Sequence, residues 1–367
     1  MPISAVDTVT LAFEHTKKQL VGPFRFWQWT RLAVVGLLAG EMGSGGCNIP
    51  SGNFNWPQQS GASRHLLGQH LLGQPLLAQD WPKIDPAILG GLIAVLVISG
   101  LVFLIVMTYV SSVMRFILFD SVLAKECHIR RGWARRQGAG WKLFLWQIGL
   151  MIGTLAGMVV LLGIPAGMAF GLGWFTAPGD HVLGLVLVGI LVFFLLAVFL
   201  VAAAVVHVLT KDFVVPQMAL DGVGAMEGWR RLWPMMQTEK GGYGLYVLMK
   251  IGLAIGAGIV IAIVSVVLAL VFLIPTVGLA IVAVLGGKTA GLTWNAGTIT
   301  LAVIVGCILF AVFMYLLALI SVPAIVFFPA YAMYFFAPRY RRLSLALYPP
   351  PVPDSGSAPP LIPETTG

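Results

Sequence analysis

The sequence predicts an all-α protein: a polytopic transmembrane helical bundle of about six transmembrane helices, with cytoplasmic interfacial elbow helices and a weak internal repeat. Of the 367 residues, 59% are apolar and only 10% are charged, and the mean hydropathy is +0.93. A typical soluble domain has about 25% charged residues. Because a water-soluble fold of this composition could not cover its surface with polar groups, a soluble enzyme, a disordered chain and a fibrous repeat are excluded.

The first predicted element is an amphipathic helix in residues 1–23. Its apolar residues recur near helical spacing, with charged residues between them: Ile3, Val6, Val9, Phe13 and Leu20. This pattern is typical of a helix that lies along the inner membrane surface. Pro23 is expected to end the helix, because proline has no backbone N–H and clashes with the preceding turn.

The transmembrane domain is predicted in residues 24–343. About 20 apolar residues cross a bilayer core about 30 Å thick, and six segments meet or approach this length: 27–46, 86–114, 143–173, 182–210, 246–275 and 298–323. The first is the weakest, since only nine residues separate Arg31 from Glu41. Residues 276–287 are apolar but too short to cross, which favours an outer interfacial or re-entrant turn.

The basic residues set the predicted orientation. Of the 22 lysines and arginines, all but Arg64, Lys83 and Lys288 belong to alternate loops and segment ends. Cytoplasmic loops carry such an excess of positive charge. We therefore expect a multi-pass protein of the plasma membrane with both termini in the cytoplasm. The net charge of +8 then reflects orientation, and nucleic acid is not expected as a partner.

Two polar segments complete the predicted organisation. The outer loop 47–85 contains a short HLLGQ-like repeat, for which sequence slippage is favoured over a binding motif. Residues 344–367 are rich in proline and are expected to form a disordered cytoplasmic tail. Cys47, Cys127 and Cys307 lie in three different settings under this topology, so no disulfide is expected.

An internal repeat follows the second, fourth and sixth segments. Each leaves the membrane through an aromatic and aliphatic stretch (115–120, 212–217 and 325–329), which predicts a bend into an elbow helix at the interface. A tryptophan or tyrosine beside paired arginines comes next. Aromatic rings prefer headgroup depth and arginine binds phosphate. We call these residues the collar: Trp133, Arg135, Arg136, Trp229, Arg230, Arg231, Arg339, Arg341 and Arg342.

Two interpretations of the collar stay open: structural anchoring, which is favoured, and specific binding of anionic lipid or of a partner protein. One elbow helix is predicted over 221–236. Asp221 would cap its start, and Met226, Trp229, Leu232 and Trp233 would face lipid. Pro234 would end it.

Glycines at intervals of four predict close helix contacts, because small residues let helices approach each other in lipid. They form one series in the third segment and another in the fifth: Gly149, Gly153, Gly157, Gly163, Gly167 and Gly171, then Gly252 and Gly256. We therefore expect the third helix at the centre of the bundle, with intramolecular packing favoured over a dimer interface.

The sequence offers few candidates for chemistry. It has no phosphate-binding glycine loop, zinc-protease motif or nucleophile elbow, and no catalytic residue, metal site or cofactor is expected. Arg115, Lys211 and Lys250 are expected to snorkel to the inner surface. The cytoplasmic acids, Asp212 among them, look like local charge balance. Glu41, expected near the outer end of the first helix, is the one candidate for a transport role.

Three stretches carry a family resemblance: Ala5 to Leu37, including FEHTK (13–17) and PFRFWQW (23–29), then FVVPQM (213–218) and GWRR (228–231). They are similar to an uncharacterised family of polytopic prokaryotic membrane proteins. That family resembles the membrane domain of some glycerophosphoryl diester phosphodiesterases. The resemblance spans most of residues 5–340 and implies a six-helix fold in the plasma membrane. It does not include the catalytic domain, so it implies no enzymatic activity.

These observations predict a non-enzymatic integral membrane protein, a scaffold or accessory subunit of a membrane complex with lipid-anchored cytoplasmic elbows. Its expected partners are membrane lipids, anionic at the cytoplasmic face, and a further membrane protein. The alternative is a permease or channel for a small apolar or amphiphilic solute, with a path near Glu41 and the third helix. A lipid-processing enzyme would need clustered acids or histidines at the inner surface.

Overall fold

The computed structural model describes residues 5–22, 24–41, 86–175, 179, 181–289 and 296–348. Five long helices dominate the described residues: α3 (Pro86–Ala124), α4 (Ile129–Gly171), α5 (Val182–Leu209), α8 (Lys240–Thr289) and α9 (Ala296–Phe336). Each belongs to a helical stretch long and apolar enough to cross a membrane. The predicted all-α polytopic fold is confirmed, and the chain is an integral membrane protein.

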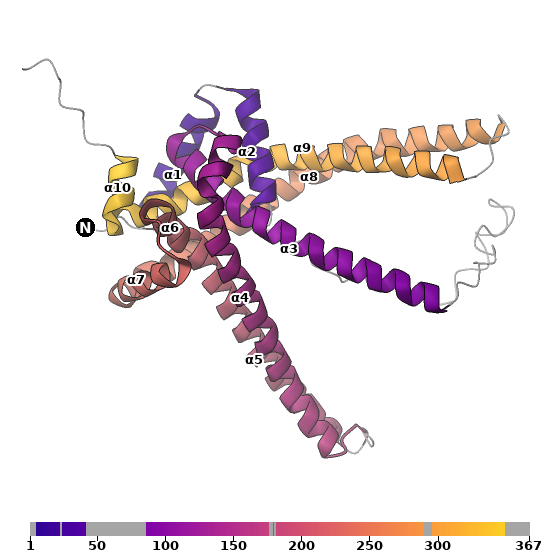
Figure 1. The fold of residues 1–367 in the computed structure, drawn as a ribbon, viewed down its shortest axis with the longest axis horizontal. Coiled ribbons are helices and arrows are strands. Elements are labelled where there is room, and N and C mark those ends of the chain that lie inside the picture. The colour runs from indigo at the N-terminus through magenta and orange to yellow at the C-terminus, as the bar shows by residue number, and fades with distance from the viewer. Residues whose placement is uncertain are drawn as a thin grey trace, which may run out of the picture.

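The long helices radiate as three arms from one compact region, which we call the hub (Figure 1). Helices α4 and α5 form one antiparallel arm, α8 and α9 form the second, and α3 forms the third alone. The hub combines the inner ends of these helices with five short ones: α1 (Asp7–Leu20), α2 (Phe26–Leu38), α6 (Val215–Asp221), α7 (Ala225–Thr238) and α10 (Arg341–Leu347).

The hydrophobic core lies in the hub, and the arms have almost none. Phe213 is fully buried at the centre, with its ring 5.0 Å from that of Tyr246 and 5.1 Å from that of Phe336. By contrast, no residue is buried in the most apolar windows of α3, α4, α5 and α8. Hydrocarbon solvates such side chains as well as a protein interior does, so the arms are built to lie in lipid.

The first predicted crossing, over 27–46, is wrong for the described residues. Helix α2 has 13 residues, so it is about 20 Å long, less than the thickness of a bilayer core. Gly40, with a φ of +75°, ends it in the left-handed conformation. Helix α2 instead packs inside the hub against α9: a Cβ on Gly36 would lie 2.5 Å from the Cδ1 of Ile325.

Two of the three predicted elbows are also wrong. Residues 115–120 lie within α3 and residues 325–329 within α9, and both helices continue to Ala124 and Phe336. Only the end of α5 is irregular: a π-helical turn, η2 (Thr210–Val214), leads into α6, which Gly222 ends with a φ of +70°. The segment 276–287 is helical and belongs to α8, not to a re-entrant turn.

The elbow helix predicted over 221–236 exists with different bounds. Asp221 ends α6 instead of capping the next helix, and α7 starts at Ala225 after Gly224. Pro234 lies inside α7, which ends at Thr238. Met226 and Trp233 are exposed as predicted, whereas Leu232 is fully buried in the hub and Trp229 is half-buried.

Helix α1 packs on the hub by a face of uncharged polar and apolar residues. Thr8, His15 and Leu20 are buried, while Val6 and Phe13 are exposed. The His15 ring lies between the Tyr334 hydroxyl and the Val122 carbonyl oxygen, 3.0 Å from each. Burial lowers the pKa of His15, which favours a neutral ring that donates to the carbonyl and accepts from the hydroxyl.

The glycine series of the third predicted segment does not pack within the chain. Only Gly157 has a neighbour, the Phe199 ring of α5; a Cβ on the other glycines of the series, Gly149, Gly153, Gly163, Gly167 and Gly171, would meet nothing within 4 Å. The same holds for Gly252 and Gly256 in α8. The prediction that this helix lies at the bundle's centre is wrong, because the arms diverge.

Cys127 and Cys307 are free, as expected from the sequence. Cys47, the outer loop 47–85 with its repeat, and the tail from residue 349 onward lie outside the described residues.

Candidate functional site: a buried charge cluster in the hub

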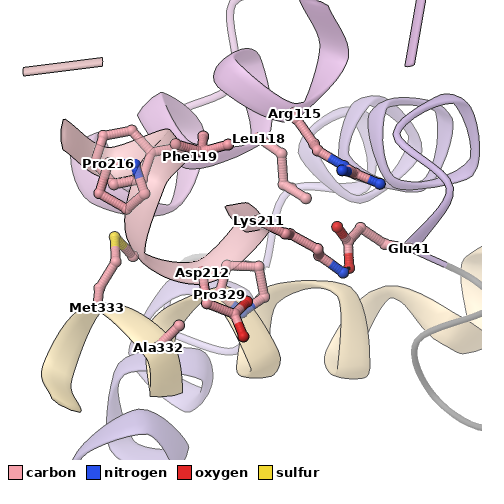
Figure 2. Close-up of a pocket in the computed structure, with 11 residues that line it drawn as sticks. Glu41, Arg115, Leu118, Phe119, Lys211, Asp212, Pro216, Pro329, Ala332 and Met333 are labelled. Carbon is pink, nitrogen blue, oxygen red and sulfur yellow. Dashed lines mark hydrogen bonds and ion pairs between the residues drawn. The ribbon is translucent and has the colours of Figure 1, made fainter. Parts of the chain in front are cut away.

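Ionisable side chains from four segments meet inside the hub, and Figure 2 shows four of them, Glu41, Arg115, Lys211 and Asp212. Glu41 follows α2, Arg115 belongs to α3, Lys211 and Asp212 belong to η2, and Lys250 belongs to α8. We call these five residues the charge cluster. They are at most 9% exposed, apart from Lys211, whose side chain is 12% exposed. Charged groups at such depth are costly and are rare unless they serve a purpose.

Two ion pairs connect the segments. Lys211 pairs with Glu41, which links η2 to the end of α2. Lys250 pairs with Asp212, which links α8 to η2. The Tyr246 hydroxyl also donates a hydrogen bond to Asp212 at 2.9 Å. A buried carboxylate is tolerated only when such partners replace the water it has lost.

Two neighbouring residues of the π-helical turn reach different partners. Lys211 pairs with Glu41 and Asp212 with Lys250. Such π-bulges occur frequently at functional sites. Thr210 begins the turn: its hydroxyl donates to the Val206 carbonyl at 2.7 Å and accepts from the Trp229 indole at 3.0 Å.

Arg115 is the least satisfied member of the charge cluster. Its Nη2 lies 3.5 Å from the His207 Nε2, while Nε and Nη1 are buried with no hydrogen-bond partner among the described residues. Arg115, Glu41, Lys211 and Asp212 line a cavity of about 30 Å³. Its remaining walls are apolar: Leu118, Phe119, Val215, Pro216, Pro329, Ala332 and Met333.

The structure corrects the sequence-based placement of these residues. Arg115 and Lys250 do not snorkel to a surface; they are buried. Glu41 does not lie at an outer interface, because it pairs with Lys211 at the inner end of α5. Asp212 does more than balance nearby surface charge, because it is buried and accepts hydrogen bonds from Lys250 and Tyr246. One feature of the sequence indicates such pairing: acidic and basic residues lie within apolar segments, where an unpaired charge is costly.

Most arginines of the collar form ion pairs. Arg136 binds both carboxylate oxygens of Asp120 at 2.7 Å and the Ala219 carbonyl at 2.7 Å. The other paired arginines are Arg339 with Glu239 at 2.6 Å, Arg342 with Asp221 at 2.7 Å, Arg231 with Asp221 at 2.8 Å, and Arg230 with Glu227 at 2.9 Å. These acids therefore balance charge locally, as expected from the sequence, and the pairs tie the short helices together.

The remaining collar residues face two directions. Trp133 packs edge-on against Tyr109, with ring centroids 6.1 Å apart, and Trp229 turns inward to Thr210. Arg135 and Arg341 are exposed, and the Arg230 side chain is 80% exposed beside Glu227. Both tryptophans are half-buried against the hub, and their anchoring at headgroup depth stays a prediction.

Within the described ranges, no three His, Cys, Asp or Glu side chains are grouped so that they could hold a metal ion.

Comparison with other proteins yields a family and no function. No curated protein matches the chain, and no solved structure does. The resemblance to the membrane domain of glycerophosphoryl diester phosphodiesterases therefore stays a prediction. Residues 3–346 match a family described as "Family of unknown function (DUF7544)". This match covers most of the chain, and the protein belongs to that family.

Proposed function

We propose that the protein is a non-enzymatic scaffold or accessory subunit of a complex in the plasma membrane. In this proposal the hub lies at the cytoplasmic face, and the arms cross the bilayer. The basic residues around the hub support this orientation, because cytoplasmic segments are enriched in Lys and Arg. The predicted resemblance to a membrane domain that accompanies a separate catalytic unit fits an accessory role.

The proposal rests on the helix faces of the arms that have no packed neighbour. A Cβ on Gly149 or Gly153 of α4 would meet no atom within 4 Å. Lipid gives helices no hydrophobic reason to associate, so glycines at this spacing favour a close-packed neighbouring helix. The described residues do not supply that neighbour at these glycines, and we propose that a helix of a partner membrane protein does.

Native mass spectrometry of the gently extracted protein tests this proposal. We expect the wild-type chain to retain a partner membrane protein at a fixed ratio, and Gly149→Ile with Gly153→Ile to lose it. Gly100→Ile is the matched control. Gly100 is an equally open glycine of α3 that belongs to no series, so this variant should keep the partner. A wild-type chain without a partner, or equal loss in the control, would contradict the proposal.

Anionic lipids are the second proposed partner. Arg135 and Arg341 present exposed guanidinium groups at the rim of the hub, and such groups attract anionic headgroups by about 1 kcal/mol each near a membrane surface. The ion-paired collar arginines are less available for this. In the same spectra we expect phosphatidylglycerol to remain bound in preference to phosphatidylcholine.

The alternative function, a permease or channel for a small apolar or amphiphilic solute, is favoured by one observation. Glu41 and Arg115 line a cavity that an apolar bundle would not need. The cavity is only about 30 Å³ and lies at the hub end of the arms. A solute path would have to continue between the arms, so the scaffold is the better supported proposal.

A further inference from the structure

We propose that the cavity of the charge cluster binds one small monovalent anion, of which chloride is the test case, with the Arg115 guanidinium as its main ligand. This site would complete the charge cluster whether or not the protein is a scaffold, because the inference uses only the interior of the hub.

The charge balance of the cluster points to an anion. Arg115, Lys211 and Lys250 are cationic, and only Glu41 and Asp212 oppose them. Each carboxylate is committed to a lysine, and among the described residues Arg115 has no carboxylate within ion-pair distance. An uncompensated charge at this depth costs several kcal/mol. One bound monovalent anion would make the cluster neutral.

The hydrogen bonds of Arg115 point the same way. Arg136 is a useful comparison, because it is also a buried hub arginine, 8% exposed against 9% for Arg115. Arg136 uses Nε, Nη1 and Nη2 on oxygen acceptors. Arg115 uses only Nη2, on His207, and leaves Nε and Nη1 without a described partner. Two buried guanidinium N–H donors beside a cavity form a binding site for a ligand that accepts hydrogen bonds.

The size and walls of the cavity select the kind of anion. A space of about 30 Å³ has room for about two water molecules or one monatomic ion. A phosphate group with its oxygens, or an organic acid, is larger than this space. The walls from Leu118, Phe119 and Pro216 are apolar, and apolar surroundings strengthen an interaction with the guanidinium. Glu41 and Asp212 also line this space, but each is paired with a lysine, so the Arg115 guanidinium favours an anion over a cation there.

Anion-dependent stability of the full chain tests the site. Protein in phosphatidylcholine nanodiscs is unfolded by heat in sodium chloride, sodium bromide or sodium gluconate at equal ionic strength. A ligand that binds only the folded state raises Tm in a saturable way. We expect this rise with chloride and bromide but not with gluconate, which is too large for the cavity. In bromide-soaked crystals, an anomalous scattering peak should lie beside Arg115.

Variants locate the effect. Arg115→Gln should weaken the chloride response at least about tenfold, because hydrogen bonds to a charged ligand are lost. Arg115→Lys keeps the charge with fewer donors and should give an intermediate affinity. Arg135→Gln is the control, since this exposed arginine lies on the nearby α4 and its loss should leave the response unchanged. If Arg115→Gln does not fold, the wild-type halide titration and the bromide peak still show whether the cavity binds an anion.

Three results would overturn the proposal. No saturable halide effect on the wild type would mean that water alone fills the cavity. An unchanged halide effect in a folded Arg115→Gln protein would place the anion elsewhere. Stabilisation by phosphatidylglycerol nanodiscs, with no response to chloride, would assign the guanidinium to a lipid phosphate and not to a free halide.

Discussion

Asp212→Asn is expected to lower the free energy of unfolding by about 3–5 kcal/mol, because it leaves the Lys250 ammonium buried without its counter-charge. Asp212 is 4% exposed and Lys250 is 7% exposed, so water cannot easily replace the lost partner. Asparagine has nearly the shape of aspartate, which makes this a test of charge and not of packing. The Tyr246 hydroxyl can still donate to the amide oxygen.

Reversible unfolding in mixed micelles of mild detergent and sodium dodecyl sulfate measures this loss. Glu227→Gln on α7 is the control. Its ion pairs with Arg230 and Arg231 are exposed, and exposed pairs contribute little. Removing both charges by Asp212→Leu with Lys250→Met and Tyr246→Phe should recover most of the stability. None of these three positions then holds a buried polar group without its partner. If Asp212→Asn alone is as stable as the wild type, the pair of Asp212 with Lys250 is not buried.

Gly140→Ala is the second substitution with a large expected effect. Gly140 lies where α4 crosses α3 in the hub, and a Cβ there would be 2.4 Å from the Val113 Cγ2 and 3.1 Å from its Cα. The side-chain contact could be relieved by rotation, but the contact with the backbone requires the two helices to separate. Overpacking of this kind costs about 1–3 kcal/mol.

Gly149→Ala provides the matched control on the same helix. A Cβ at Gly149 would meet nothing within 4 Å, and alanine is better than glycine in a helix by about 0.5–1 kcal/mol. The same unfolding measurement should therefore show a loss for Gly140→Ala and no loss for Gly149→Ala. Equal losses would mean that α4 packs along its whole length, as the sequence predicted and the structure does not show.

The long helices could be predicted because the composition of each stretch decides its environment. An apolar run such as 182–210 has one favourable location, in lipid, whatever the rest of the chain does. The helix ends could not be predicted equally well. Residues 325–329 were expected to bend at Pro329, yet α9 continues to Phe336, because neighbouring helices of the hub can satisfy the freed backbone groups.

The charge cluster could not be predicted because it depends on where helices meet. Snorkelling of Lys211 and pairing of Lys211 with Glu41 fit the same sequence, and the short α2 decides between them. The glycines show the same limit. The spacing of Gly149 and Gly153 attracted attention, whereas Gly140, which belongs to no predicted series, makes a close contact with Val113. Sequence spacing indicates which faces could pack and not which partner is present.

A double-mutant cycle between Glu41 and Lys211 tests most directly the central claim that α2 ends inside the hub, beside the inner end of α5. Glu41→Gln, Lys211→Met and the double variant are compared by their free energies of unfolding. Residues in contact show a coupling energy of about 0.5–3 kcal/mol, whereas distant residues add independently. The buried pair predicts a coupling of about 1 kcal/mol or more. Additive effects would contradict it and would return Glu41 to the far end of a first crossing.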